Sequence, residues 1–198
     1  MSRAIPLRLA FAAFLLMTLP NAPAHAAERA IDKDVLVEAP LDTVWSAWTT
    51  REGITGFFAP DAEIDARVGG AFHIFINPYA PAGTKGADTM QFLAIQPKTM
   101  LSFDWNAPPS LPFVRGQRTV VILRFTPDGE RTRVSLHHVG WGDPAGSNGK
   151  EWDDAYRYFD RAWGNVLANL QKRYAPGGAP IDWTDWLRQM KAATPAAS

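Results

Sequence analysis

The segment from residue 150 to residue 174 carries large apolar side chains at helical spacing, and this stripe limits the possible folds more than any other feature. Its members lie three or four residues apart, which places them on one face of an α-helix with the charged residues elsewhere. Short strands are predicted between about residues 61 and 140, so the helix is expected to lie across a sheet. The stripe consists of Trp152, Tyr156, Phe159, Trp163, Val166 or Leu167, and Leu170.

Turn residues and apolar alternation predict the elements before this helix. A first strand over residues 31–38 stops before Pro40, and two short helices follow. Thr50 is expected to cap the second helix and Gly56 to end it. The clearest hairpin joins strands 119–125 and 132–139 through a turn at residues 127–129. Further strands are predicted at residues 61–66, 71–76, 89–95 and 100–105.

The N-terminal residues predict a secretory signal peptide. Arg3 and Arg8 precede an apolar run over residues 9–19, and Ala24-His25-Ala26 provides a small-residue cleavage site. This run is shorter than the roughly 20 residues that a membrane-spanning helix needs. We therefore expect cleavage near Ala26, a mature chain without an integral membrane span, and a periplasmic or secreted location.

Composition excludes several kinds of site. The chain has no cysteine, which rules out disulfides, thiol nucleophiles and sulfur-ligated metals. Its formal net charge is +0 and no basic cluster stands out, so no nucleic acid partner is expected. Eight Trp and eleven Phe instead supply a large aromatic core and suit a cavity for an apolar or ring-bearing ligand.

Five stretches of the chain, in this order, carry a family resemblance. They are Val44-Trp45-Ser46-Ala47-Trp48-Thr49, Gly69-Gly70-Ala71-Phe72, Ser102-Phe103-Asp104-Trp105, His138-Val139-Gly140-Trp141, and Trp152 with Tyr156, Phe159, Trp163 and Leu167.

Over residues 30–175 these stretches resemble the START-like SRPBCC superfamily, and in particular the branch of homologues of the heat-shock chaperone ATPase activator. The resemblance implies an α+β helix-grip fold. In that fold a seven-stranded antiparallel sheet wraps around a long C-terminal helix, and two short helices follow the first strand. It also implies an internal cavity, which different members use for lipids, aromatic metabolites or polyketides.

The sequence divides into five parts. A signal peptide over residues 1–26 precedes a START-like domain over residues 30–175, a linker over residues 176–181 and an additional amphipathic helix over residues 182–193. Residues 194–198 are predicted to be a disordered tail. The extra helix is expected either to dock on its own domain or to bind a protein partner that the sequence does not identify. Its apolar face consists of Trp183, Trp186, Leu187 and Met190.

The histidines of the mature chain are His73, His137 and His138. Neighbouring residues of a strand point to opposite faces, so His137 and His138 are not expected to share a metal ion. Alternation places His138 inward, facing the core or a cavity. Nucleophile elbows, phosphate-binding glycine loops and His-Glu zinc motifs are missing from the sequence, so we expect neither a metal nor another cofactor. A cyclase-like or hydrolase-like enzyme that pairs His138 with a carboxylate remains an alternative.

The sequence favours a module that binds a small hydrophobic or aromatic ligand between the sheet and the long helix. We expect the cavity beneath the first turns of that helix, covered by the proline-rich loop over residues 106–116. The side chains predicted to form its wall are Trp48, Phe57, Trp105, His138, Trp141, Trp152 and Tyr156.

Overall fold

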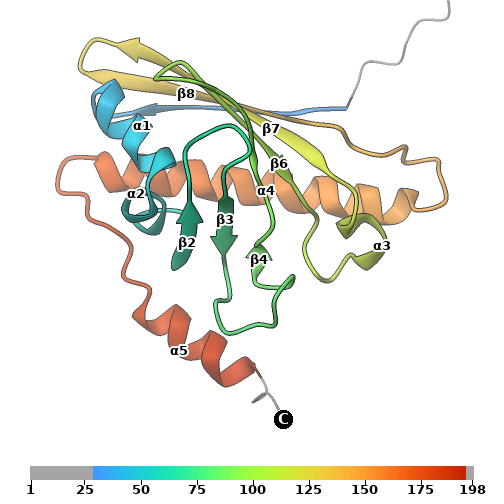
Figure 1. The fold of residues 1–198 in the computed structure, drawn as a ribbon. Helices are drawn as coiled ribbons and strands as arrows, with labels where there is room; N and C mark the ends of the chain where they lie inside the picture. The colour runs from blue at the N-terminus through green and yellow to red at the C-terminus, as the bar shows by residue number, and fades with distance from the viewer. Residues whose placement is uncertain (1–28, 195–198) are drawn as a thin grey trace, which may run out of the picture.

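The computed structural model describes residues 29–194. The predicted signal peptide and residues 195–198 of the predicted tail lie outside this range. A curved antiparallel sheet is crossed by the long helix α4 (Gly149–Tyr174), which confirms the predicted helix-grip arrangement (Figure 1). Within residues 29–194, no helix combines the length and the apolar character needed to cross a membrane.

The main sheet has five antiparallel strands in the order β1-β8-β7-β6-β5. At its centre β7 and β8 form the predicted hairpin, whose last pair is Asp128 with Arg131. Gly129 lies in this turn at φ 63°, a conformation that glycine adopts without a steric penalty. The strands are β1 (Ile31–Val37), β5 (Phe92–Gln96), β6 (Met100–Trp105), β7 (Thr119–Asp128) and β8 (Arg131–Val139).

A second sheet extends the first and contains β2 (Asp61–Ile64), β3 (Phe72–Phe75) and β4 (Gly86–Ala87). The bridge from Ala71 to Gln91 and two backbone hydrogen bonds of Phe92, with Gly69 and Gly70, connect the sheets. The described residues thus form eight strands where we expected seven. The additional strand is β4, whose two residues lie between the strands predicted at residues 71–76 and 89–95.

Helices α1 (Leu41–Thr49) and α2 (Arg51–Thr55) follow β1, as the sequence predicted. The Thr50 hydroxyl accepts a hydrogen bond from the Gly53 backbone N–H at 3.0 Å, and α2 ends at Gly56. Thr50 therefore caps a helix of only five residues and satisfies one of its free N–H groups.

The apolar stripe of α4 faces the sheet and forms much of the core. Trp163 is 1% exposed, and Tyr156 is half-buried with its hydroxyl donating to the Ala30 carbonyl at 2.8 Å. Burial of each large apolar side chain contributes about 1.5 to 3 kcal/mol, so the stripe anchors α4 firmly. The fully covered members are Trp152, Phe159, Trp163, Val166, Leu167 and Leu170.

The proline-rich loop contains a short helix that the sequence analysis did not predict, α3 (Pro112–Arg115). Val114 is fully buried in a small second core with Ala107, Trp152 and Ala155. Phe113, in contrast, is 71% exposed. Val114 thus packs the loop against the first turns of α4.

Helix α5 (Thr184–Ala193) contacts its own domain through two indole groups. The Trp183 indole donates to the Thr55 carbonyl at 2.6 Å, and the Trp186 indole donates to the Ile76 carbonyl at 2.8 Å. None of its side chains is fully buried, and Figure 1 shows the helix at the periphery, beyond β2 and β3. These contacts favour docking in cis over presentation of α5 to a partner.

Candidate functional site

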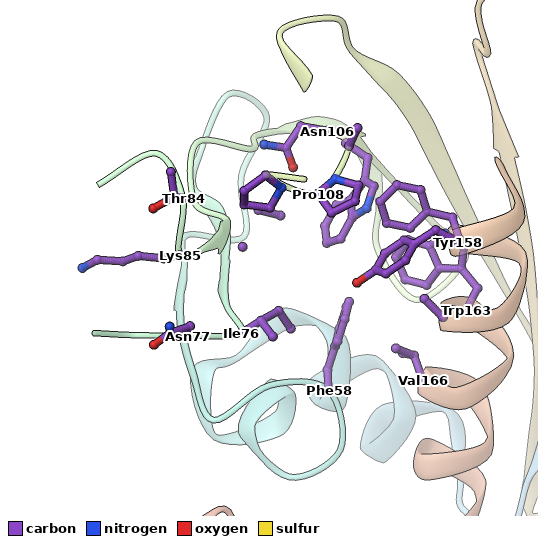
Figure 2. A pocket seen from close by; sticks show the side chains of 17 residues that line it. Phe58, Ile76, Asn77, Thr84, Lys85, Asn106, Pro108, Tyr158, Trp163 and Val166 are labelled. Atoms are coloured by element: carbon purple, nitrogen blue, oxygen red, sulfur yellow. The ribbon is translucent and has the colours of Figure 1, made fainter. Parts of the chain in front are cut away.

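A pocket of about 300 Å³ lies beside the middle turns of α4, and we call it the α4 pocket (Figure 2). It is lined by α4, by residues 76–87 around β4, and by residues 105–109 at the end of β6. The contribution of α4 consists of Tyr158, Phe159, Ala162, Trp163 and Val166.

The inner wall of the α4 pocket is aromatic. Trp105 and Trp163 lie with their ring centroids 5.2 Å apart, and Phe58 contacts both, at 6.0 and 5.7 Å. All three side chains are buried, so their mutual contacts fix the shape of this wall. A flat apolar molecule would find a preformed surface there.

We call residues 76–87 and 106–109 the outer wall of the α4 pocket. Arg115, which belongs to α3, holds this wall in place. Its guanidinium donates to the carbonyls of Gly83 at 2.6 Å and Gly86 at 2.9 Å, and also to the carbonyl of Ala107. Asp88 lies 3.5 Å from the guanidinium and accepts the Gly83 N–H at 2.6 Å. Burial lowers the pKa of Arg115, and the Asp88 carboxylate opposes this change. One cation therefore joins the two segments that form the outer wall.

A second attachment of the outer wall comes from the C-terminal region. The Asn77 side-chain amide donates to the Thr194 hydroxyl at 3.1 Å, next to the bond between Trp186 and Ile76. Both Ile76 and Asn77 line the α4 pocket. The α5 region thus supports this wall at residues that Arg115 does not contact.

The seven side chains predicted to bind the ligand lie in three places. Trp105 lines the α4 pocket. Trp48 and Phe57 are fully buried in the core, with ring centroids 5.0 Å apart. The remaining four gather near the start of α4, where the Trp141 ring contacts His138, Trp152 and Tyr156 at centroid distances of 4.3, 6.5 and 5.3 Å.

The pocket therefore lies further along α4 than we expected. The space beneath the first turns is filled by Trp141 and the three side chains that it contacts. The Trp141 indole also donates to the His138 carbonyl at 3.0 Å. The proline-rich loop does border the pocket, but only through residues 106–109. Phe159 and Trp163 belong to the predicted apolar stripe but are not among the seven side chains expected to form the cavity wall. Asn106 lies in the loop that was expected to cover the cavity, whereas no pattern in the sequence pointed to Tyr158 or to residues 76–87.

His138 is completely buried, as alternation along its strand predicted. The Trp163 indole donates to Nδ1 at 2.9 Å, so the ring proton is on Nε2, which donates to the Thr119 hydroxyl at 2.7 Å. That hydroxyl in turn donates to the Trp105 carbonyl at 3.2 Å. This chain of hydrogen bonds connects the two tryptophans of the pocket wall through β7 and β8.

The protonation state of His138 opposes an acid/base role. Burial, with a smaller contribution from the nearby His137, lowers its pKa to about 3, so the ring is neutral at pH 7. Both ring nitrogens are bonded to Thr119 and Trp163, and within the described chain no carboxylate is among their partners. The geometry gives no support to a His138–carboxylate pair. Residues 29–194 also contain no group of three His, Asp or Glu side chains placed to hold a metal ion.

Comparison with known proteins identifies the family. Residues 38–175 match the family model described as Activator of Hsp90 ATPase homolog 1-like protein. A search of curated proteins gave no match.

Solved structures share the fold at low sequence identity. Protein MLL2253 from Mesorhizobium loti is 22% identical, with a TM-score of 0.56 over 72% of this chain and 94% of its own. CalU16 from Micromonospora echinospora is also 22% identical, with a TM-score of 0.56 over 84% and 83%. The Aha1 dimer from Colwellia psychrerythraea is 15% identical, with a TM-score of 0.55 over 75% and 98%.

These structural likenesses agree with the arrangement of sheet and helix described above, and the family match spans most of the domain. The chain belongs to the Activator of Hsp90 ATPase homolog 1-like family, within the START-like SRPBCC superfamily.

Proposed function

We propose that the protein binds a small hydrophobic or aromatic ligand in the α4 pocket. The observation that carries this proposal is a preformed aromatic wall, made by Phe58, Trp105 and Trp163, in a pocket with a volume of about 300 Å³. That volume lies at the lower end of the range for ligand pockets, roughly 300 to 1,000 Å³. A ligand of one or two rings suits such a space.

The energetics of the site also support binding of an apolar molecule. Transfer of apolar surface from water contributes about 25 cal/mol for each Å² buried. Because the wall is already in place, a ligand would not have to order Trp105 or Trp163 when it binds. A larger share of the gain from burial would then appear as affinity than at a wall that has to be ordered first.

Filling the pocket is expected to weaken binding at least about tenfold, a cost near 1.4 kcal/mol. Ala162 lines the pocket from α4, so Ala162→Phe places a ring in the space that a ligand would use. Isothermal titration calorimetry with 2-naphthol measures the change. Ala168→Phe is the matched control, because Ala168 is exposed on the same helix and away from the pocket. Equal affinity in Ala162→Phe and the wild type would place the ligand elsewhere.

We further propose that the protein acts in the periplasm or outside the cell. The support is the arrangement of Arg3, Arg8, the apolar run and Ala24-His25-Ala26. Expression of the full chain in a Gram-negative host is expected to give a periplasmic product that begins at Ala27, as measured by intact mass. A cytoplasmic product that retains residues 1–26 would contradict this location.

A further inference from the structure

The α4 pocket contains a nearly buried polar side chain without a partner. Asn106 directly follows β6 and is 6% exposed. Within residues 29–194, neither its side-chain oxygen nor its nitrogen makes a hydrogen bond. These atoms also differ from the indole nitrogens of Trp48 and Trp105, which lack a partner but are sealed from open space. The Asn106 amide therefore remains accessible from the pocket that it lines.

An unpaired amide in such a position is unfavourable. A polar group removed from water loses its hydrogen bonds to solvent, and most buried polar groups in folded proteins regain them from a partner. Because Asn106 has no partner in the described chain, the partner must come from the pocket. The group that restores its hydrogen bonds would be part of a bound molecule or a water that such a molecule displaces.

Tyr158 supplies a second uncommitted group. Its hydroxyl makes no hydrogen bond within the described residues, and Figure 2 shows it reaching from α4 into the open space. Other polar side chains at the rim are already engaged. The Asn77 amide is bonded to Thr194, and the Thr84 hydroxyl donates to the Pro81 carbonyl at 2.7 Å.

Charge further limits the ligand. Lys85 lies over the Phe75 ring at 5.4 Å, and Figure 2 shows its side chain directed away from the space. Arg115 and Asp88 are engaged with each other and with the backbone of the outer wall. An ionised ligand group would therefore lose its hydration without gaining a countercharge, which is costly.

We infer that Asn106 recognises an uncharged hydrogen-bonding group, such as a hydroxyl, carbonyl or carboxamide, on a ligand with an apolar ring body. Tyr158 offers a second hydrogen-bonding group in the same pocket. This assignment rests on the proposed function and adds the chemical class of the ligand. Asn106 and Tyr158 can each donate and accept a hydrogen bond. The pocket therefore distinguishes ligands that carry a neutral polar group from those that lack one, and accepts donor and acceptor groups alike.

Three probes of similar shape test this assignment by isothermal titration calorimetry at pH 7. Naphthalene lacks a polar group, 2-naphthol carries a neutral one, and 2-naphthoate carries an anion. The wild type is expected to bind 2-naphthol about tenfold more tightly than naphthalene, and also more tightly than 2-naphthoate. Asn106→Leu is expected to remove most of the preference for 2-naphthol over naphthalene while leaving the affinity for naphthalene within about twofold. Asn165→Leu, an exposed site on α4, is the matched control and keeps the preference.

Stability supplies a second readout. If Asn106 serves the ligand, ligand-free Asn106→Leu melts at or above the wild-type temperature, because an unpaired polar group has been replaced by an apolar one. A clearly lower melting temperature would assign Asn106 to the fold instead. An unchanged preference for 2-naphthol in Asn106→Leu would overturn the inference and leave the proposed function intact. Failure of all three probes to bind the wild type would contradict the proposed function itself.

Discussion

Lowering the pH from 7 to 4 is expected to remove about 3 kcal/mol from the free energy of unfolding through His138 alone. Burial keeps the pKa of this ring near 3 in the folded protein, against 6.5 for a free histidine. Below pH 6.5 the unfolded chain therefore binds a proton that the folded chain does not. Each further pH unit favours unfolding by about 1.4 kcal/mol until the folded pKa is reached.

Urea unfolding between pH 6.5 and 5 measures this effect, because Asp and Glu titrate mostly at lower pH. His138→Gln is expected to be less stable at pH 7 and to lose most of the pH dependence in this window. His137→Gln is the matched control, since His137 is the neighbouring residue on the exposed face and is bonded to Asp32 at 2.7 Å. If both variants retained the wild-type slope, His138 would not be its source.

Arg115→Met is expected to lower the free energy of unfolding by about 2 to 4 kcal/mol and to loosen the outer wall of the α4 pocket. The methionine replaces the aliphatic part of the side chain but none of its donors. The carbonyls of Gly83, Gly86 and Ala107 would lose their bonds to the guanidinium, and Asp88 would lose its cation. Because the Asp88 side chain is only 5% exposed, water compensates poorly for that loss.

Denaturant unfolding gives the change in stability, and hydrogen exchange of residues 83–88 reports the local loosening. Arg118→Met serves as the control. Arg118 is three residues further along and pairs with Asp104 at 3.7 Å, but its side chain is 40% exposed. The control is expected to lose less than about 1 kcal/mol. Comparable losses in the two variants would show that Arg115 has no special role in the wall.

The elements that the sequence predicted best are those with local signals. The spacing of Trp152, Phe159 and Trp163 requires only the helical period, and Thr50 caps α2 through a residue three positions away. The turn at Gly129 is similarly local. Helix α3 and strand β4 were missed because each has four residues or fewer. Their conformations depend on Val114 and Arg115, which contact distant parts of the chain.

The candidate site was less predictable for the same reason. Alternation placed His138 inside, but its partners Thr119 and Trp163 are 19 and 25 residues away in the chain. Arg115 binds backbone carbonyls, which leave no pattern in a sequence. Asn106 directly follows β6 and begins the proline-rich loop, but nothing in the sequence indicates that its side chain lacks a partner. Its unsatisfied amide becomes visible only when the surrounding side chains are in place.

The α4 pocket draws its walls from segments that begin at Phe58 and end at Val166. An unfolded chain cannot assemble such a receptor, so any occupant binds the native state alone. By mass action, a guest present at a hundred times its dissociation constant adds about 2.7 kcal/mol to the resistance against unfolding. The ligand concentration around the protein and its free energy of unfolding are thereby thermodynamically linked.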